Sequence, residues 1–149
     1  MKLTVLGPGC WGLTLAWLLS NNFDEVCVWG RTQDISDDLR INKRTTKPLE
    51  VQLDKKVEIT DNLKEAISNA QIILLVVATS GIRPVCRQFK EAGLKDDQIL
   101  VNLSKGLELP SLKRMSEVIK DELPTAKLVV LSGPTLAKEI LNGCPTGAC

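Results

Sequence analysis

The sequence contains no histidine and no tyrosine, and its aromatic residues are limited to three tryptophans and two phenylalanines. Histidine is the most frequent general acid or base in enzymes, so the usual side chain for proton transfer is absent. Acid–base chemistry would therefore fall to Lys, Asp, Glu or Cys, or to residues outside this chain. The lack of histidine also argues against a structural zinc site.

The chain has almost no excess charge and no long hydrophobic run. Its 19 Lys and Arg residues nearly balance its 18 Asp and Glu residues, so nothing indicates a basic surface for nucleic acid. No apolar stretch approaches the roughly 20 residues that a membrane-spanning helix needs. Gly7, Pro8, Gly9 and Gly12 also interrupt the apolar N-terminus where a secretory signal needs continuity. We therefore expect a cytoplasmic protein with neither a nucleic-acid partner nor a membrane span.

Cysteine is present without a pairing or ligand pattern. The number of cysteines is odd, their spacing is wide and no C-x-x-C occurs; they are Cys10, Cys27, Cys86, Cys144 and Cys149. This distribution indicates free thiols in a reducing compartment rather than disulfides or a metal site.

Short apolar runs alternate regularly with segments of helical spacing. Strands are expected at residues 3–6, 25–29, 57–60, 72–77, 99–103 and 128–131. Helices are expected at residues 11–21, 35–41, 63–68, 84–91, 111–123 and 136–141. In a chain of 149 residues this alternation predicts one α/β domain. We expect a Rossmann-type, doubly wound, mostly parallel sheet with helices on both faces.

Local signals refine several of these elements. Asp61 is expected to cap the helix that follows it. The polar segment 42–54 is expected to be irregular, and residues 78–81 to form a loop. Pro84 then fits the first turn of the next helix, where a missing N–H is tolerated. Leu112 is expected on the buried stripe of the helix 111–123.

The most informative motif is the turn Gly7-Pro8-Gly9-Cys10-Trp11-Gly12, which follows an apolar strand and opens a helix. In that context G-x-G-x-x-G is the dinucleotide-binding fingerprint. Gly7 permits the tight turn, Gly9 lets the backbone approach a pyrophosphate, and Gly12 lets the helix pack closely on the strand. The start of the helix would offer free N–H groups to the phosphates.

The turn after the second strand normally distinguishes NAD from NADP. A carboxylate there accepts a hydrogen bond from the ribose 2′-hydroxyl, whereas an arginine accommodates a 2′-phosphate. The strand ends in Trp29-Gly30-Arg31, and Asp34 stands slightly beyond the usual acidic position. Arg31 therefore favours NADP, or indifference between the two cofactors; as the alternative, it is a solvated surface residue.

Two further loops are expected at the same edge of the sheet. Lys105 ends a buried strand in Ser104-Lys105-Gly106, where its charge suits a phosphate or a carbonyl oxygen. Ser132-Gly133-Pro134-Thr135 precedes a helix and combines N–H groups with hydroxyls, which suits an anion. Each loop also has a purely structural interpretation. Lys105 would be an exposed loop lysine, and residues 132–135 would be an ordinary helix start.

Together these segments resemble NAD(P)-dependent glycerol-3-phosphate dehydrogenase. The matching motifs follow the family's order: Gly7-x-Gly9-x-Trp11-Gly12, Trp29-x-Arg31, Ser104-Lys105-Gly106-Leu107-Glu108, Leu131–Glu139 and Gly143–Thr146. The resemblance implies reversible hydride transfer between NAD or NADP and C2 of dihydroxyacetone phosphate, which yields sn-glycerol 3-phosphate for phospholipid synthesis. It leaves a homodimer open.

The resemblance also implies roles for individual residues. Cofactor contacts are expected at Gly7, Gly9, Cys10, Trp11, Gly12, Arg31, Lys105 and Ala137. Substrate contacts are expected at Lys105, Gly133 and Thr135. The family's catalytic lysine lies in a helical domain beyond its nucleotide domain, so we expect no catalytic residue and no metal within residues 1–149.

We therefore expect residues 1–149 to be an NAD(P)-binding domain that is incomplete at its C-terminal end and inactive alone. The segment 41–54 departs from the family because it lacks a leucine- and proline-rich stretch. A stand-alone NAD(P)-binding or sensing module is the alternative function. A dehydrogenase of β-hydroxyacids or sugar nucleotides is disfavoured by the motif at 132–139.

Overall fold

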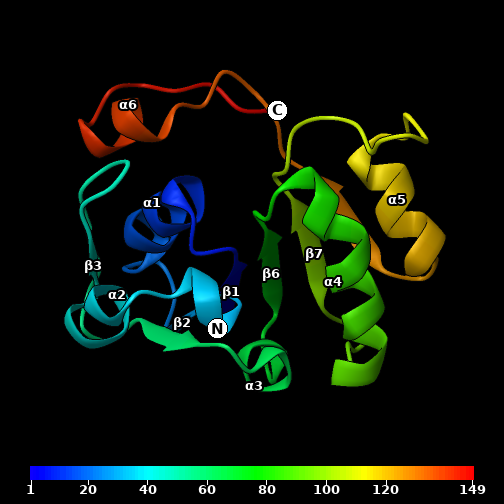
Figure 1. Ribbon diagram of the computed structural model, residues 1–149, viewed down its shortest axis with the longest axis horizontal. Helices are drawn as coiled ribbons and strands as arrows, with labels where there is room; N and C mark the ends of the chain where they lie inside the picture. Colours follow the sequence, from blue (N-terminus) through cyan, green and yellow to red (C-terminus); the bar gives the residue numbers. More distant parts are fainter.

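The computed structural model describes residues 1–149 and is built on a six-stranded sheet (Figure 1). Its strands are β1 (Lys2–Leu6), β2 (Glu25–Trp29), β5 (Glu58–Thr60), β6 (Ile72–Leu75), β7 (Ile99–Asn102) and β8 (Lys127–Val130). The spatial order is β5-β2-β1-β6-β7-β8, and every neighbouring pair is parallel. The expected doubly wound parallel sheet is confirmed.

Helices cover both faces of this sheet. They are α1 (Cys10–Leu19), α2 (Asp37–Asn42), α3 (Leu63–Ile67), α4 (Thr79–Ala92), α5 (Met115–Glu122) and α6 (Ala137–Leu141), with a 3-10 turn η1 (Thr32–Asp34). In Figure 1, α1 and α6 lie on one side of β6, and α4 and α5 lie on the other. This layering is what a parallel sheet requires, because both of its faces are apolar.

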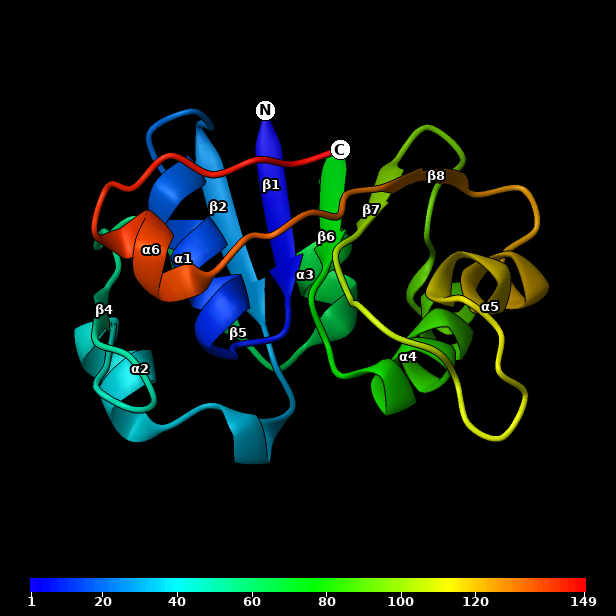
Figure 2. The ribbon, with the colours of Figure 1, turned by 90° about the horizontal axis from the view of Figure 1, so that it is seen from above.

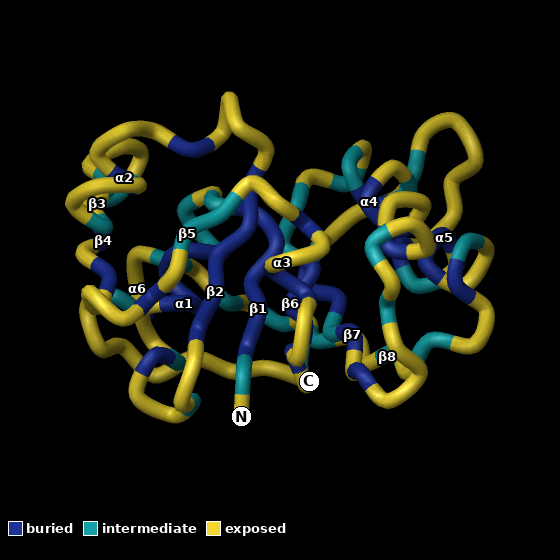
Figure 3. The backbone as a smooth tube through the Cα atoms, turned by 90° about the horizontal axis from the view of Figure 1, so that it is seen from below, coloured by how far each residue is buried: buried dark blue, intermediate teal, exposed yellow.

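The alternation of side chains along β1 produces two hydrophobic cores. Leu3 and Val5 are fully buried in the core beneath α1 and α2, whereas Leu6 is fully buried in the core beneath α3, α4 and α5. Thr4 shares the second face, and its hydroxyl donates to the carbonyl of Ala66 at 2.6 Å. Figure 3 shows the buried backbone concentrated in the central strands, with the loops exposed around them.

Helix α4 begins five residues before Pro84, so the prediction that residues 78–81 form a loop and that Pro84 lies in the first turn was wrong. Ala78 has an extended backbone and stands directly before the helix. At this position Pro84 removes a hydrogen bond that the carbonyl of Ser80 would otherwise accept. The cost is tolerated within an amphipathic helix that buries Ile82, Val85 and Phe89.

Three smaller expectations were also wrong. The cap of α3 is Asn62, which accepts from the backbone N–H of Glu65 at 3.3 Å, rather than Asp61. Helix α5 begins only at Met115, and Leu112 lies in the preceding turn with φ of 57° and 63% exposure. The polar segment 42–54 contains a small antiparallel ribbon of β3 (Arg44–Thr45) and β4 (Val51–Gln52).

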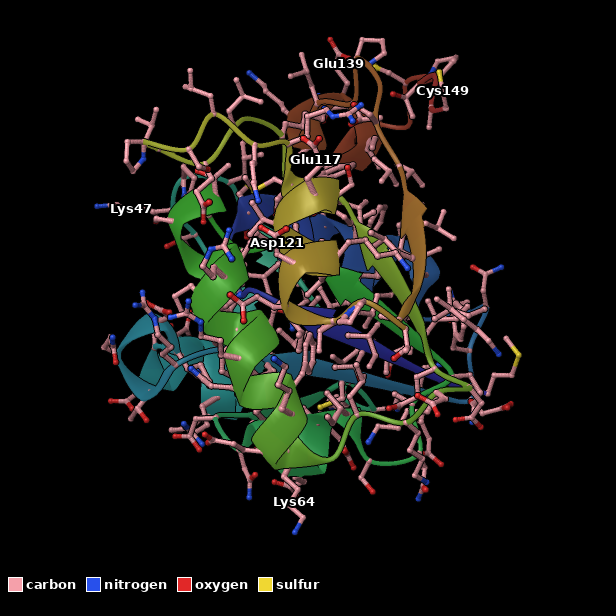
Figure 4. The ribbon with its side chains drawn as sticks, turned by 90° about the vertical axis from the view of Figure 1, so that its right-hand side faces the viewer. Lys47, Lys64, Glu117, Asp121, Glu139 and Cys149 are labelled. Atoms are coloured by element: carbon pink, nitrogen blue, oxygen red, sulfur yellow. The ribbon has the colours of Figure 1, made fainter.

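Arg83 of α4 holds the loop after β7 against α5. Its guanidinium donates to both carboxylate oxygens of Glu108, at 2.6 and 2.8 Å, and to Glu122 at 2.7 Å. A third carboxylate, Asp121, accepts from Arg83 at 3.2 Å. Figure 4 shows α4 and α5 side by side, with Asp121 labelled on α5. These contacts fix the segment that directly follows Lys105.

Candidate functional site

The sheet order reverses between β1 and β6, since the chain proceeds outward to β2 on one side and returns to β6 on the other. Ligands of doubly wound folds bind at such a reversal, beyond the carboxyl ends of the strands. A cavity of about 460 Å³ lies at this place. Its lining combines the residues after β1, β2 and β6 with one face of α4.

The glycine turn has the geometry that the fingerprint requires. Gly7 has a φ of 121°, and a Cβ there would lie 2.6 Å from the carbonyl oxygen of Val76. A Cβ at Gly12 would lie 2.0 Å from the carbonyl oxygen of Gly7. By contrast, no atom lies within 4 Å of a Cβ built on Gly9. Gly7 and Gly12 are therefore required by the fold, whereas Gly9 leaves open space beside the cavity.

The start of α1 is left available to an anion. Gly9 precedes the helix in an extended conformation, no side chain caps the first turn, and no acidic residue lies within it. The leading N–H groups of a helix have no partners within it, and its dipole is positive at this end. The residues present thus fit a dinucleotide pyrophosphate, with Gly9 providing the room and α1 the donors.

Arg31 and Asp34 lie together at the β2 side of this cavity and both line it. Nε of Arg31 donates to Oδ2 of Asp34 at 2.7 Å, and Nη2 donates to Oδ1 at 3.0 Å. The hydrogen bonds from Arg31 hold the pKa of Asp34 below its usual range. Asp34, which the sequence placed slightly too far along, is therefore a residue of the site.

Helix α4 supplies a wall that sequence reasoning missed. Ser80, Pro84 and Gln88 line the cavity at intervals of four residues, and Gly81 and Val85 lie on the same face. This four-residue spacing was missed, because residues 78–81 were expected to be a loop and not the start of α4. A helix beginning at Thr79 would have revealed it from spacing alone.

A second cavity of about 360 Å³ adjoins the first, since Val76, Val77 and Ala78 line both. Trp11, Leu103, Ser104, Lys105 and Thr135 complete its lining. Nε1 of Trp11 is buried and has no hydrogen-bond partner. Such an unpaired buried donor is costly, so it indicates a place where a ligand group can accept a hydrogen bond.

Lys105 connects the two loops that the sequence singled out. Its Nζ donates to the carbonyl oxygen of Gly133 at 2.6 Å and to the hydroxyl of Thr135 at 3.0 Å. Gly133 has a φ of 147°, and a Cβ there would lie 2.5 Å from the carbonyl oxygen of Gly147. The end of the chain crosses back at this point, where Cys149 pairs with Ser132 through two backbone hydrogen bonds (Figure 2).

Four predicted contact residues line neither of these cavities: Cys10, Gly12, Gly133 and Ala137. Ala137 is the first residue of α6 and lines neither of them. Cys10 is the first residue of α1 and also lines neither cavity. Burial raises the pKa of the Cys10 thiol, which suits a backbone role rather than a nucleophile. Cys27 and Cys86 are buried in the core, and burial raises their thiol pKa values to about 11 and about 12.

The fold and the glycine turn define the class of this protein: it is a dinucleotide-binding domain of the Rossmann type. The family described as "NAD-dependent glycerol-3-phosphate dehydrogenase N-terminus" matches residues 2–149, and the chain belongs to this family. No cluster of three or more His, Cys, Asp or Glu side chains could hold a metal ion. None of the helices has the length and apolar character needed to cross a membrane.

Curated relatives support the same assignment. Glycerol-3-phosphate dehydrogenase [NAD(P)+] of Fusobacterium nucleatum is 40% identical over 149 residues, which cover 98% of this chain and 44% of the relative. The enzyme of the same description from a Thermoanaerobacter species is 38% identical over all of this chain and 44% of its own length. The chain thus spans less than half the length of these relatives.

Solved structures show the same fold. Glycerol-3-phosphate dehydrogenase of Plasmodium falciparum superposes with a TM-score of 0.87 at 23% identity, covering 99% of this chain and 44% of that one. The Coxiella burnetii enzyme gives a TM-score of 0.85 at 24% identity, covering 99% and 45%. Pyrroline-5-carboxylate reductase of Coxiella burnetii gives 0.63 at 19% identity, covering 91% and 44%, so the fold extends to other reductases.

Proposed function

We propose that this chain is the cofactor-binding part of a glycerol-3-phosphate dehydrogenase and binds NAD or NADP along the carboxyl edge of its sheet. The observation that supports this most directly is the meeting of the two cavities at Val76–Ala78. One cavity has the glycine turn and Arg31, which suit the adenosine and pyrophosphate half. The other has Trp11, Lys105 and Thr135, which suit the nicotinamide and a small phosphorylated substrate.

The residues of the chain would bind and orient the two reactants. A bound nicotinamide supplies or accepts the hydride that is exchanged with C2 of dihydroxyacetone phosphate or sn-glycerol 3-phosphate. The ammonium group of Lys105 and the hydroxyl of Thr135 can hold substrate oxygens, because both are already fixed by mutual contact. Trp11 forms an apolar wall that excludes water from the hydride path.

Proton transfer to the substrate oxygen would depend on a group outside residues 1–149. The chain has no histidine or tyrosine, and the ammonium group of Lys105, held by the carbonyl of Gly133 and the hydroxyl of Thr135, has the substrate-binding role given above. The family resemblance places the donating lysine in a further, helical domain. Residues 1–149 alone would therefore bind the cofactor without appreciable turnover.

Calorimetric titration and an absorbance assay test this proposal together. The purified chain is titrated with NADH and with NADPH, each with and without sn-glycerol 3-phosphate. We expect nucleotide binding, an effect of sn-glycerol 3-phosphate on that binding, and no dihydroxyacetone phosphate-dependent loss of NADH absorbance. If sn-glycerol 3-phosphate does not change the affinity for the nucleotide, the result would support a stand-alone sensing module instead. Measurable turnover would show that the proton donor lies within this chain.

The cytoplasm is the proposed location. All five cysteines are free, and Cys144 and Cys149 are exposed, which suits a reducing compartment. Fractionation of cells followed by immunodetection checks this expectation.

A further inference from the structure

The cavity beside the glycine turn has no net charge of its own. Arg31 is the single Lys or Arg among its lining residues, and Asp34 is the single Asp or Glu. A 2′-phosphate carries about two negative charges, since its second pKa is near 6. The lining therefore offers one positive charge for such a group, and an adjacent carboxylate opposes it.

Arg31 and Asp34 form a bidentate ion pair. Both carboxylate oxygens accept from the guanidinium, at 2.7 and 3.0 Å, through Nε and Nη2. The backbone N–H of Asp34 also donates to the carbonyl of Arg31 at 2.8 Å. The side chain of Asp34 is 33% exposed and that of Arg31 is 66% exposed, so each can reach a ligand without leaving the other.

The turn that carries this pair is fixed from both ends. A Cβ on Gly30 would lie 2.5 Å from Cγ of Pro8, so β2 meets the glycine turn closely here. Ile35 is buried directly after η1. The hydroxyl of Thr32 donates to Asp61 at 3.0 Å, which anchors η1 to the segment after β5. Asp34 is thus positioned by the backbone and not only by Arg31.

The two nucleotides meet this pair differently. The 2′-hydroxyl of an NAD ribose can donate to the carboxylate of Asp34 while Arg31 stays bound to it. The 2′-phosphate of NADP can reach the remaining N–H groups of Arg31, but it then lies beside the carboxylate of Asp34, which repels it. A neutral hydroxyl gains a hydrogen bond from this carboxylate, whereas an anionic group is opposed by it.

We propose that Asp34 sets the nucleotide preference of this site, so that the dinucleotide without a 2′-phosphate is favoured over the one with it. This inference rests on the proposed function of the cavity. It modifies the sequence-based interpretation of Arg31. An arginine at this position favours NADP, but here the carboxylate of Asp34 neutralises its charge.

Affinities of NADH and NADPH for the wild-type chain and for Asp34→Asn, measured by calorimetry, test the proposal. We expect the wild type to bind NADH about tenfold more tightly than NADPH, a factor that corresponds to about 1.4 kcal/mol. Asp34→Asn keeps the shape of the side chain and removes its charge. We expect it to strengthen NADPH binding about tenfold and to weaken NADH binding, so that the preference is lost or reversed.

Glu117→Gln is the matched control. It also removes a carboxylate that is bonded to an arginine three residues earlier, Arg114, but this pair lines neither cavity. Its NADH-to-NADPH ratio should equal that of the wild type. A wild-type preference for NADPH, or an unchanged ratio in Asp34→Asn, would overturn the inference while leaving the proposed function intact. If neither nucleotide binds the wild type, both fail.

Discussion

Gly9 and Gly12 stand three residues apart in the same turn but have opposite surroundings. A Cβ at Gly12 would meet the carbonyl oxygen of Gly7 at 2.0 Å, whereas one at Gly9 would meet nothing within 4 Å. Gly9 has a φ of −73°, which any residue adopts. At the residue scale, one glycine therefore serves packing and the other serves the ligand.

Alanine substitutions separate these two roles. Gly9→Ala should change the free energy of unfolding by less than about 1 kcal/mol, because the gain from a less flexible unfolded chain opposes the weaker cap. It should nevertheless weaken nucleotide binding at least about tenfold, since its Cβ occupies the space for the pyrophosphate.

Gly12→Ala should instead destabilise the fold by about 1–3 kcal/mol or more, because backbone atoms cannot move aside for the added methyl group. Urea denaturation and calorimetric titration of both variants check the pair. Equal stability losses in the two variants would contradict the assignment of Gly9 to the ligand.

At the scale of elements, the loop after β7 depends on α4. Glu108 accepts from Arg83 and also from the hydroxyl of Ser111 at 2.7 Å, and these bonds lower its pKa to about 2. Arg83→Met should therefore lower the denaturation midpoint more than Arg114→Met, whose partner Glu117 is half exposed. It should also loosen the loop that carries Lys105, detected as faster amide exchange.

The contribution of Arg83 should depend on pH. Because the pKa of Glu108 is depressed in the folded chain, its pairing stabilises the fold above the ordinary pKa of 4.5 and is lost as pH falls toward about 2. The difference in denaturation midpoint between wild type and Arg83→Met should be largest above about pH 5 and should shrink on acidification. If the difference in denaturation midpoint stays constant across this pH range, the pairing of Arg83 with Glu108 does not cause it.

At the scale of the whole molecule, the larger cavity lies between two halves of the sheet. The residues after β1 and β2 form one side, and those after β6 together with α4 form the other. A nucleotide there would stabilise only the folded arrangement of both halves. Saturation with NADH at about 100 times its Kd should add about 2.7 kcal/mol, seen as a higher melting temperature. Because Gly9→Ala should raise Kd at least about tenfold, the same NADH concentration should add only about 1.4 kcal/mol or less to this variant.

The order of elements and the glycine turn could be predicted because both depend on local signals. Apolar runs identify strands, and three glycines between a strand and a helix define a tight turn. The start of α4 could not be predicted, because a proline within a helix imitates a helix start. The role of Asp34 could not be predicted either. The 3-10 turn η1 brings its carboxylate next to the guanidinium of Arg31, and the sequence does not show that turn.

The three tryptophans stand at three different places with respect to the cavities. Trp29 lines the larger cavity and Trp11 the smaller one, whereas Trp17 is 38% exposed near the end of α1 and lines neither. Tryptophan emission overlaps the absorption of reduced nicotinamide, so bound NADH should quench it by energy transfer. The indoles beside the two cavities thus make the chain its own optical reporter of a bound reduced nicotinamide.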